Sequence, residues 1–333
     1  MGRAVKIAVL GAGGFGTAIA QSIAPSVTAV TLVARSADIV ESVNRRHRNR
    51  YYLPDVPLLE NVRAHDFAGA EAVLRDADVI TFCVPSSVTR DVARDVAESV
   101  AGKIIMSTAK GIAFPSLETM SEVITAETSP AEIVTLSGPT FADELVRGFT
   151  SYATLGGDGP TARKLAEEMF GDSNLHMDFC DDRRGVEYCG ILKNVFSIAV
   201  GIIDAFAQSN NTHFGFLNYC YKEMCRFLAV LCADTSISQK FCAFGDFTLT
   251  ASVDKSRNRT LGMMIGKNFI EVDQVKSGII FEGSKSIHAI HKIARDNGLK
   301  APITDFVNGI FTGETDTPLE YRVMHLLKQL GDA

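Results

Sequence analysis

A glycine-rich turn near the N-terminus constrains this chain more than any other short segment. The strand-like residues KIAVL run into Gly11-Ala12-Gly13-Gly14-Phe15-Gly16, and a helix-like segment, FGTAIAQSIA, follows. In such a unit the first glycine allows a tight turn, the second lets the backbone approach a pyrophosphate, and the third permits close helix–strand packing. Free N–H groups at the start of the helix would face the anion. The segment predicts a dinucleotide-binding turn and fits a glycine turn without a ligand less well; the candidate contacts are Gly11, Gly13, Gly14, Phe15 and Gly16.

Strand-like and helix-like segments alternate through the first half of the chain. Short apolar runs separated by helical patterns are typical of a parallel, doubly wound sheet. From Gly185 onward the periodicity is mostly helical. We therefore predict an α/β protein with two domains: an N-terminal Rossmann-type doubly wound, mostly parallel sheet over residues 1–183, and an all-helical domain over residues 184–333. The strand candidates are KIAVLGAG, AVTLVAR, DADVITFCVP, KIIMSTAKG, EIVTLSGPT and YATLGG.

Composition excludes several classes of protein. The net charge of -6 argues against a nucleic-acid-binding surface. No uncharged segment is long enough to span a membrane, and the N-terminus lacks the pattern of a signal peptide. The 7 cysteines include no C-x-x-C pair, so neither a zinc site nor a disulfide framework is expected. A reducing compartment, the cytoplasm, fits this usage, with the cysteines as small core residues.

Arg35 follows the second predicted strand, where an acidic residue would hold the ribose hydroxyls of NAD. An arginine there can instead stack on adenine or bind a 2′-phosphate, which favours NADP slightly. A solvated surface arginine explains the position about as well. The cofactor choice between NAD and NADP therefore stays open.

Lys193 and Asn194 lie at the start of an apolar run that extends from Ile191 to Phe206. A helix this apolar is predicted to be buried, and burial disfavours the charged form of a lysine. The simplest interpretation is a lysine whose ammonium group reaches solvent from a helix end. The functional interpretation is a site at which a lysine of lowered pKa is useful.

An ordered series of motifs resembles one family, the soluble NAD(P)-dependent glycerol-3-phosphate dehydrogenases, which reduce dihydroxyacetone phosphate. The resemblance extends from about residue 6 to residue 300. Beyond the glycine turn, the motifs are Ala109-Lys110-Gly111, Ser137-Gly138-Pro139-Thr140-Phe141-Ala142-Asp143-Glu144, Leu192-Lys193-Asn194, Gly245-Asp246 with Thr250, Ser256-Arg257-Asn258-Arg259 and Glu282-Gly283. It implies a Rossmann domain followed by a helical domain, a nicotinamide cofactor and a homodimer. It also implies a small phosphorylated substrate and a role in phospholipid biosynthesis.

The resemblance implies the catalytic residues. Lys193 corresponds to the family's general acid in reduction and general base in oxidation. Lys110 corresponds to a second lysine that reaches both cofactor and substrate, where it would help to stabilise a developing oxyanion. Asp246 and Thr250 correspond to polar partners of the catalytic lysine, although Asp246 alone could be a turn residue after Gly245.

The resemblance also implies the binding residues. Arg257 and Asn258 correspond to a phosphate clamp, because arginine binds phosphate through two parallel hydrogen bonds. Taken alone, the sequence KSRNR could equally be a solvated basic loop. Besides Lys193, the expected substrate contacts are Lys110, Gly138, Thr140, Asn194, Asp246, Ser256, Arg257 and Asn258. Beyond the glycine turn and Arg35, the expected cofactor contacts are Pro85, Lys110, Ala142, Arg257 and Glu282.

Several positions depart from the family pattern. Cys189 and Ile191 are bulkier than the small residues usual before the lysine, and Phe214, Phe216 and Tyr219 replace small or basic residues. These changes predict altered packing, an altered pocket or an altered dimer contact. Two alternatives therefore remain: a dehydrogenase of a related phosphorylated hydroxy compound, and a catalytically silent cofactor-binding protein. The presence of Lys110, Lys193 and Asp246 argues against the second.

Overall fold

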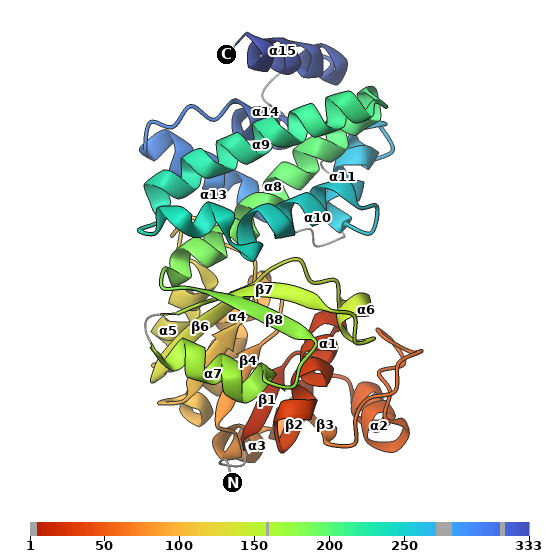
Figure 1. Ribbon diagram of the computed structural model, residues 1–333, viewed down its shortest axis with the longest axis vertical. Helices are drawn as coiled ribbons and strands as arrows, with labels where there is room; N and C mark the ends of the chain where they lie inside the picture. Colours follow the sequence, from red (N-terminus) through yellow and green to blue (C-terminus); the bar gives the residue numbers. More distant parts are fainter. Residues whose placement is uncertain (1–4, 158–159, 271–281, 314–316, 333) are drawn as a thin grey trace. The chain divides into compact units, whose positions relative to one another are not determined.

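A single sheet organises the first part of the chain in the computed structural model (Figure 1). Over the residues that the structure describes, 5–157, 160–270, 282–313 and 317–332, the sheet has 8 strands in the order β3-β2-β1-β4-β5-β6-β7-β8. Neighbouring strands are parallel except for the antiparallel pair β6 and β7. The strands are β1 (Lys6–Leu10), β2 (Ala29–Ala34), β3 (Val62–Asp66), β4 (Val79–Phe82), β5 (Ile104–Ser107), β6 (Glu132–Ser137), β7 (Ser151–Gly156) and β8 (Leu175–Cys180).

The central strands were predicted and the two edge strands were not. β1 and β4 are mostly apolar, and all of their residues except Lys6 are buried, as expected for strands covered on both faces. β3 reads VRAHD and β8 reads LHMDFC, so both carry polar residues at positions that are partly exposed. Edge strands tolerate such residues because only one side of the strand is paired.

The chain divides into two compact units. Unit 1 comprises Met1–Ala109 and Thr119–Glu187, and unit 2 comprises Lys110–Glu118 and Tyr188–Ala333. The sheet and its helices lie in unit 1. Its helices are α1 (Gly14–Ile23), α2 (Ala37–Arg46), α3 (Glu71–Asp76), α4 (Ser86–Val100), α5 (Met120–Thr128), α6 (Ala142–Leu145) and α7 (Pro160–Phe170), with short turns η1 (Ala24–Ser26) and η2 (Phe67–Gly69).

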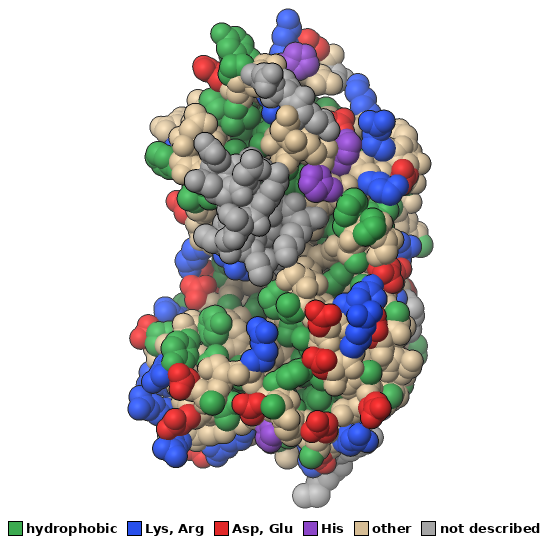
Figure 2. Space-filling view, turned by 180° about the vertical axis from the view of Figure 1, so that it is seen from behind, with side chains coloured by type: hydrophobic (Ala, Val, Ile, Leu, Met, Phe, Trp, Pro, Cys, Tyr) green, Lys and Arg blue, Asp and Glu red, His purple; other side chains and the backbone are tan. Residues whose placement is uncertain are grey.

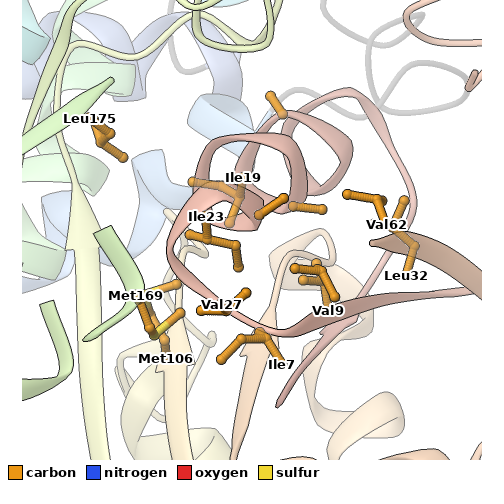
Figure 3. Close-up of a cluster of buried hydrophobic side chains, with 14 of the residues drawn as sticks. Ile7, Val9, Ile19, Ile23, Val27, Leu32, Val62, Met106, Met169 and Leu175 are labelled. Carbon is orange, nitrogen blue, oxygen red and sulfur yellow. The ribbon is translucent and has the colours of Figure 1, made fainter. Parts of the chain in front are cut away.

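The core of unit 1 lies between the sheet and its helices. Figure 3 shows Ile19 and Ile23 of α1 directed toward Ile7 and Val9 of β1. All four side chains are almost completely buried. Burial of this kind contributes roughly 1.5–3 kcal/mol for each large aliphatic side chain. It also fixes the start of α1 directly beyond the end of β1.

Unit 2 is helical, which together with the sheet of unit 1 confirms the predicted fold class. Its helices are α8 (Arg183–Phe206), whose first residues belong to unit 1, α9 (Asn210–Leu231), α10 (Asp246–Ser252), α11 (Arg257–Gly266), α13 (Glu282–Asp296), α14 (Pro302–Thr312) and α15 (Leu319–Gly331), with short turns η3 (Thr235–Gln239) and η4 (Phe241–Gly245).

Helices α8 and α11 meet backbone to backbone. A Cβ atom added at Gly201 would lie 2.1 Å from the carbonyl oxygen of Arg259, and one added at Gly262 would lie 2.1 Å from that of Ile198. Any larger residue would force the two helices apart. The two glycines therefore fix the position of α11 against α8.

Helix α8 is long and apolar enough to cross a membrane by length and composition, with a mean hydropathy of 1.6 over its best window. However, 83% of that window is buried inside the protein, as expected for a core helix. Among the described residues, α8 is the one helix of this length and hydropathy.

The 7 cysteines are all free, and most of them are buried. Figure 2 shows one face of the molecule, on which acidic and basic side chains are interspersed among the described residues. Among these residues no large basic surface is visible on this face, and the net charge of the chain is -6.

Candidate active site

Lys193 is buried inside unit 2 instead of reaching solvent. Its residue is 6% exposed. Its Nζ donates to Oδ1 of Asp246 at 2.5 Å and to Oγ1 of Thr250 at 2.9 Å. Because Asp246 and Thr250 are one helical turn apart on α10, one face of that short helix holds the ammonium group.

Lys110 joins the same carboxylate from a different part of the chain. Its Nζ donates to Oδ2 of Asp246 at 2.8 Å, and its side chain is 17% exposed. Although Lys110 follows β5 in sequence, it belongs to unit 2. The structure thus brings together Lys110, Lys193, Asp246 and Thr250. Two ammonium groups share one carboxylate, which leaves a net positive charge available to an oxyanion.

Burial and charge set the protonation of this cluster. Burial, aided by the nearby charge of Lys110, lowers the pKa of Lys193 from 10.5 to about 7, and Asp246 only partly opposes this. Burial alone would raise the pKa of Asp246, yet the two lysines outweigh it and hold that pKa below its usual value. Lys193 can therefore give up and regain a proton near neutral pH, whereas Asp246 stays charged.

The predicted phosphate clamp lies at the start of α11. Ser256 caps the helix, because its Oγ accepts a hydrogen bond from the N–H of Arg259 at 3.3 Å. Arg257 is exposed. The side-chain oxygen of Asn258 is buried and has no hydrogen-bond partner among the described residues. Asn194 is buried at 5% exposure next to Lys193.

The glycine turn of unit 1 suits an anion. Gly11 has a φ of 107°, and a Cβ there would lie 2.6 Å from the carbonyl oxygen of Cys83. A Cβ at Gly16 would lie 1.9 Å from the oxygen of Gly11. At Gly13, by contrast, a Cβ would meet nothing within 4 Å, so the backbone there is open to a ligand. The first N–H groups of any helix lack an intrahelical partner, and α1 starts at Gly14 without an acidic residue or a side-chain cap that would compete with an anion for them.

The other predicted cofactor and substrate residues of unit 1 follow its strands. Arg35 is exposed directly after β2, and Pro85 precedes α4. Oγ1 of Thr140 donates to the carbonyl oxygen of Gly138 at 3.2 Å. Ala142 starts α6, and its Cβ would lie 3.9 Å from a Cβ added at Gly14.

Gly138 has a packing reason to be glycine, since a Cβ there would lie 2.5 Å from the Cα of Ala153. Glu282 opens α13, and its side chain lies outside the described residues.

Sequence reasoning missed a residue that holds the glycine turn. Asn49 is completely buried, and its Nδ2 donates to the carbonyl oxygen of Ala12 and to Oγ1 of Thr17, both at 2.9 Å. Asn49 lies beyond α2 in the basic segment NRRHRNRYY, and no local pattern singles it out. It supports the turn from a distant part of the chain.

The residues that depart from the family pattern lie in helices α8 and α9. Cys189 and Ile191 are completely buried in α8, so their bulk contributes to packing in the helical core. Phe216 is buried as well, whereas Phe214 is 58% exposed. The side chain of Tyr219 lies beside Lys222, whose Nζ is 5.5 Å from the ring centroid.

Both halves of the chain match sequence models of one family. The model described as NAD-dependent glycerol-3-phosphate dehydrogenase N-terminus matches residues 6–161. The model described as NAD-dependent glycerol-3-phosphate dehydrogenase C-terminus matches residues 182–319.

Individual proteins show the same likeness. A glycerol-3-phosphate dehydrogenase (NAD(P)+) from Methanothermobacter thermautotrophicus is 40% identical over 303 residues, which covers 91% of this chain and 92% of the relative. One from Nitratidesulfovibrio vulgaris is 34% identical over 304 residues, with coverage of 90% and 92%. The crystal structure of glycerol-3-phosphate dehydrogenase from Coxiella burnetii superposes with a TM-score of 0.86 at 27% identity, covering 97% of this chain and 99% of that one.

Proposed function

Because this chain belongs to the NAD-dependent glycerol-3-phosphate dehydrogenase family, we propose that it interconverts dihydroxyacetone phosphate and sn-glycerol 3-phosphate, with NAD or NADP as cofactor. The observation that carries this proposal is the buried Lys193 held by Asp246 and Thr250, with Lys110 on the same carboxylate. The two alternatives, a dehydrogenase of a related phosphorylated compound and a silent cofactor-binding protein, have no such observation in their favour.

In this proposal Lys193 moves the proton. Reduction of a ketone places negative charge on the carbonyl oxygen, and the bound nicotinamide supplies the hydride. The ammonium group of Lys193 donates a proton to that oxygen, and its neutral amine accepts the proton in the reverse direction. A pKa lowered by burial to about 7 suits both directions near neutral pH.

Lys110 and Asp246 support this step. The ammonium group of Lys110 adds positive charge beside the developing oxyanion. Asp246 stays ionised and holds both Nζ atoms in place. Thr250 adds a neutral acceptor that limits the directions in which the amine can point.

The phosphate of the substrate is assigned to Ser256, Arg257 and Asn258. The guanidinium of Arg257 is exposed and can bind a phosphate through two hydrogen bonds. The buried amide end of Asn258 has an oxygen without a partner among the described residues, and a half-turn of the amide puts its NH2 donors there. Asn194, Gly138 and Thr140 complete the proposed substrate contacts.

The cofactor is assigned to Gly11, Gly13, Gly14, Phe15 and Gly16, with further contacts from Arg35, Pro85, Lys110, Ala142, Arg257 and Glu282. The open backbone at Gly13 and the uncapped start of α1 support this assignment for the pyrophosphate. Arg35 favours the 2′-phosphate of NADP, because no acidic residue occupies that position. By these assignments, residues 1–183 supply most of the dinucleotide contacts, and residues 184–333 supply the catalytic lysine and the phosphate clamp of the substrate.

The cellular setting is proposed from the family and from the state of the cysteines. We place the protein in the cytoplasm as a homodimer that feeds glycerophospholipid synthesis. The free, mostly buried cysteines suit a reducing compartment. Light scattering at several concentrations would test the dimer.

The decisive experiment measures oxidation of NADH and NADPH by the purified protein with dihydroxyacetone phosphate and, in parallel, with other phosphorylated ketones. We expect turnover with dihydroxyacetone phosphate and formation of sn-glycerol 3-phosphate. Turnover with another ketone phosphate alone would replace this proposal with the related dehydrogenase, and cofactor binding without any turnover would leave the silent binding protein.

A further inference from the structure

A second polar network of unit 2 joins three helices outside the lysine cluster. It consists of Asp204 near the end of α8, His213 at the start of α9 and Arg259 at the start of α11. Nδ1 of His213 lies 2.9 Å from Oδ1 of Asp204, and Nη2 and Nε of Arg259 donate to Oδ2 at 2.8 and 3.2 Å. Because a carboxylate only accepts, Nδ1 of His213 carries a proton.

The same network holds both sides of the segment between α10 and α11. Nε2 of His213 lies 3.2 Å from Oγ of Ser252, the last residue of α10. Nη1 of Arg259 pairs with Asp254 in the connecting loop. The imidazole therefore contacts this segment at Ser252, and the guanidinium contacts it at Asp254. Both groups also bond to Asp204 of α8.

This segment links the catalytic lysine to the proposed clamp. Helix α10 begins at Asp246, which holds Lys193, and α11 begins at Arg257. Asp254 and Arg257 are exposed. The orientation of Arg257 relative to Lys193 thus depends on the contacts that residues 252–256 make with the neighbouring helices.

Other contacts fix the course of α11 and the backbone of the turn. The close glycine contacts at Gly201 and Gly262 fix where α11 crosses α8, and Oγ1 of Thr260 donates to the carbonyl oxygen of Asp254 at 3.2 Å. The side chains of Arg259 and His213 add bonds to Asp204 of α8 and, from His213, to Ser252 of α10. They therefore hold the turn to both neighbouring helices.

We propose that His213 is a positioning residue for the phosphate end of the substrate, acting through Asp204, Ser252 and Arg259 on the turn that carries Arg257 and Asn258. The proposal rests on the proposed function, since it takes those two residues as the phosphate clamp. Asp204, His213 and Ser252 are bonded in the same sequence as the aspartate, histidine and serine of a hydrolytic triad. In such a triad the carboxylate stabilises the imidazolium that forms during catalysis. Here the guanidinium of Arg259 already neutralises the carboxylate of Asp204. The network therefore holds structure and does not activate Ser252.

The test compares three variants of the full chain. His213→Leu removes both bonds, and His213→Gln keeps a side-chain N–H that can donate to Asp204. His288→Leu is the matched control, because His288 is a partly buried histidine of unit 2 bonded to Asn308 at 2.8 Å. Each variant is assayed for kcat, for the KM of dihydroxyacetone phosphate and of NAD(P)H, and for inhibition by inorganic phosphate. Protection against thermal unfolding by inorganic phosphate is measured as well.

For His213→Leu we expect the KM of dihydroxyacetone phosphate and the inhibition constant of phosphate to rise together by about tenfold, the size of one lost bond to a charged group. The KM of NAD(P)H and kcat should stay within about twofold, a change well below that bond. His213→Gln should recover most of the loss, and His288→Leu should show none of it.

Unchanged phosphate inhibition in His213→Leu would overturn the proposal, as would equal losses in kcat and in both KM values. If His213→Leu does not fold, His213→Gln and Asp204→Asn decide the same question through phosphate inhibition. Absence of wild-type turnover would refute the proposed function alone, and the protection by phosphate would then still decide the role of His213.

Discussion

The charge balance around Lys193 makes the replacement Asp246→Asn the most informative perturbation of this protein. In the native cluster one carboxylate lies 2.5 Å from Nζ of Lys193 and 2.8 Å from Nζ of Lys110. With charge centres about 4 Å apart and an effective dielectric near 20, each attraction amounts to roughly 4 kcal/mol. Losing both attractions would cost an amount comparable to the roughly 5–15 kcal/mol by which a typical protein is stable. Loss of the proton of Lys193 costs less free energy, so we expect the cluster to respond in that way.

The expected consequence is a shift of the pH profile. Lys193 is charged below a pKa of about 7 and neutral above it. Ketone reduction needs the charged acid, so its rate is highest below that pH and falls as the pH rises through it. Oxidation needs the neutral amine, so its rate rises over the same range. Without Asp246, which raises the pKa of Lys193, the midpoint should move to lower pH. At pH 8, reduction should slow by roughly 100- to 1,000-fold, within the usual contribution of a general acid.

The assay is steady-state oxidation of NAD(P)H from pH 5 to pH 10, followed as kcat/KM, beside the reverse reaction. Lys110→Met supplies a comparison of opposite sign, because the charge of Lys110 lowers the pKa of Lys193 and its loss should move the midpoint upward. Thr250→Val removes an uncharged partner and should move the midpoint little. If Asp246→Asn and Lys110→Met move the midpoint in the same direction, the electrostatic account of Lys193 is wrong.

Four further outcomes are expected. Lys193→Ala should lower turnover by roughly 100-fold or more while NADH still binds in a fluorescence titration; retained turnover would remove the catalytic assignment. Arg257→Ala should raise the KM of dihydroxyacetone phosphate by roughly tenfold or more with a smaller change in kcat, and an unchanged KM would remove the clamp. Arg35→Ser should lower kcat/KM with NADPH more than with NADH, whereas equal losses would mean that the arginine does not read the 2′-phosphate. Gly262→Ala should lower the free energy of unfolding by about 1–3 kcal/mol or more, because the added Cβ would meet the backbone of α8. Gly215→Ala, in an open part of α9, should raise that free energy slightly. Urea titration of both variants measures these changes, and the reverse order of stability would contradict the prediction.

The fold was largely predictable because buried parallel strands leave a strong trace in sequence. KIAVL and VITF are mostly apolar and are bounded by turn residues, and both form central strands. VRAHD and LHMDFC fail that test, since edge strands are only partly buried. The antiparallel direction of β7 was also beyond reach, because strand direction depends on how the preceding connection returns to the sheet.

The catalytic cluster was predictable only through the resemblance. Lys193 and Asp246 are 53 positions apart, and no periodicity relates them. Burial of Lys193 could be expected from the apolar run, whereas the bond from Lys110 to the same carboxylate depends on a segment that leaves one unit and joins the other. The network of Asp204, His213 and Arg259 left no sequence signal at all, because it arises where three helices end or begin together.

The assignment of residues 110–118 to unit 2 has a consequence for how this protein is made. These residues leave the ribosome between two segments of unit 1, long before the helices that will surround them exist. Ile112, which is almost completely buried in the finished protein, must wait in solvent until α8 and its successors are synthesised. A nascent chain that ends at Glu187 would thus carry residues 110–118 without the helices of unit 2 to which they belong.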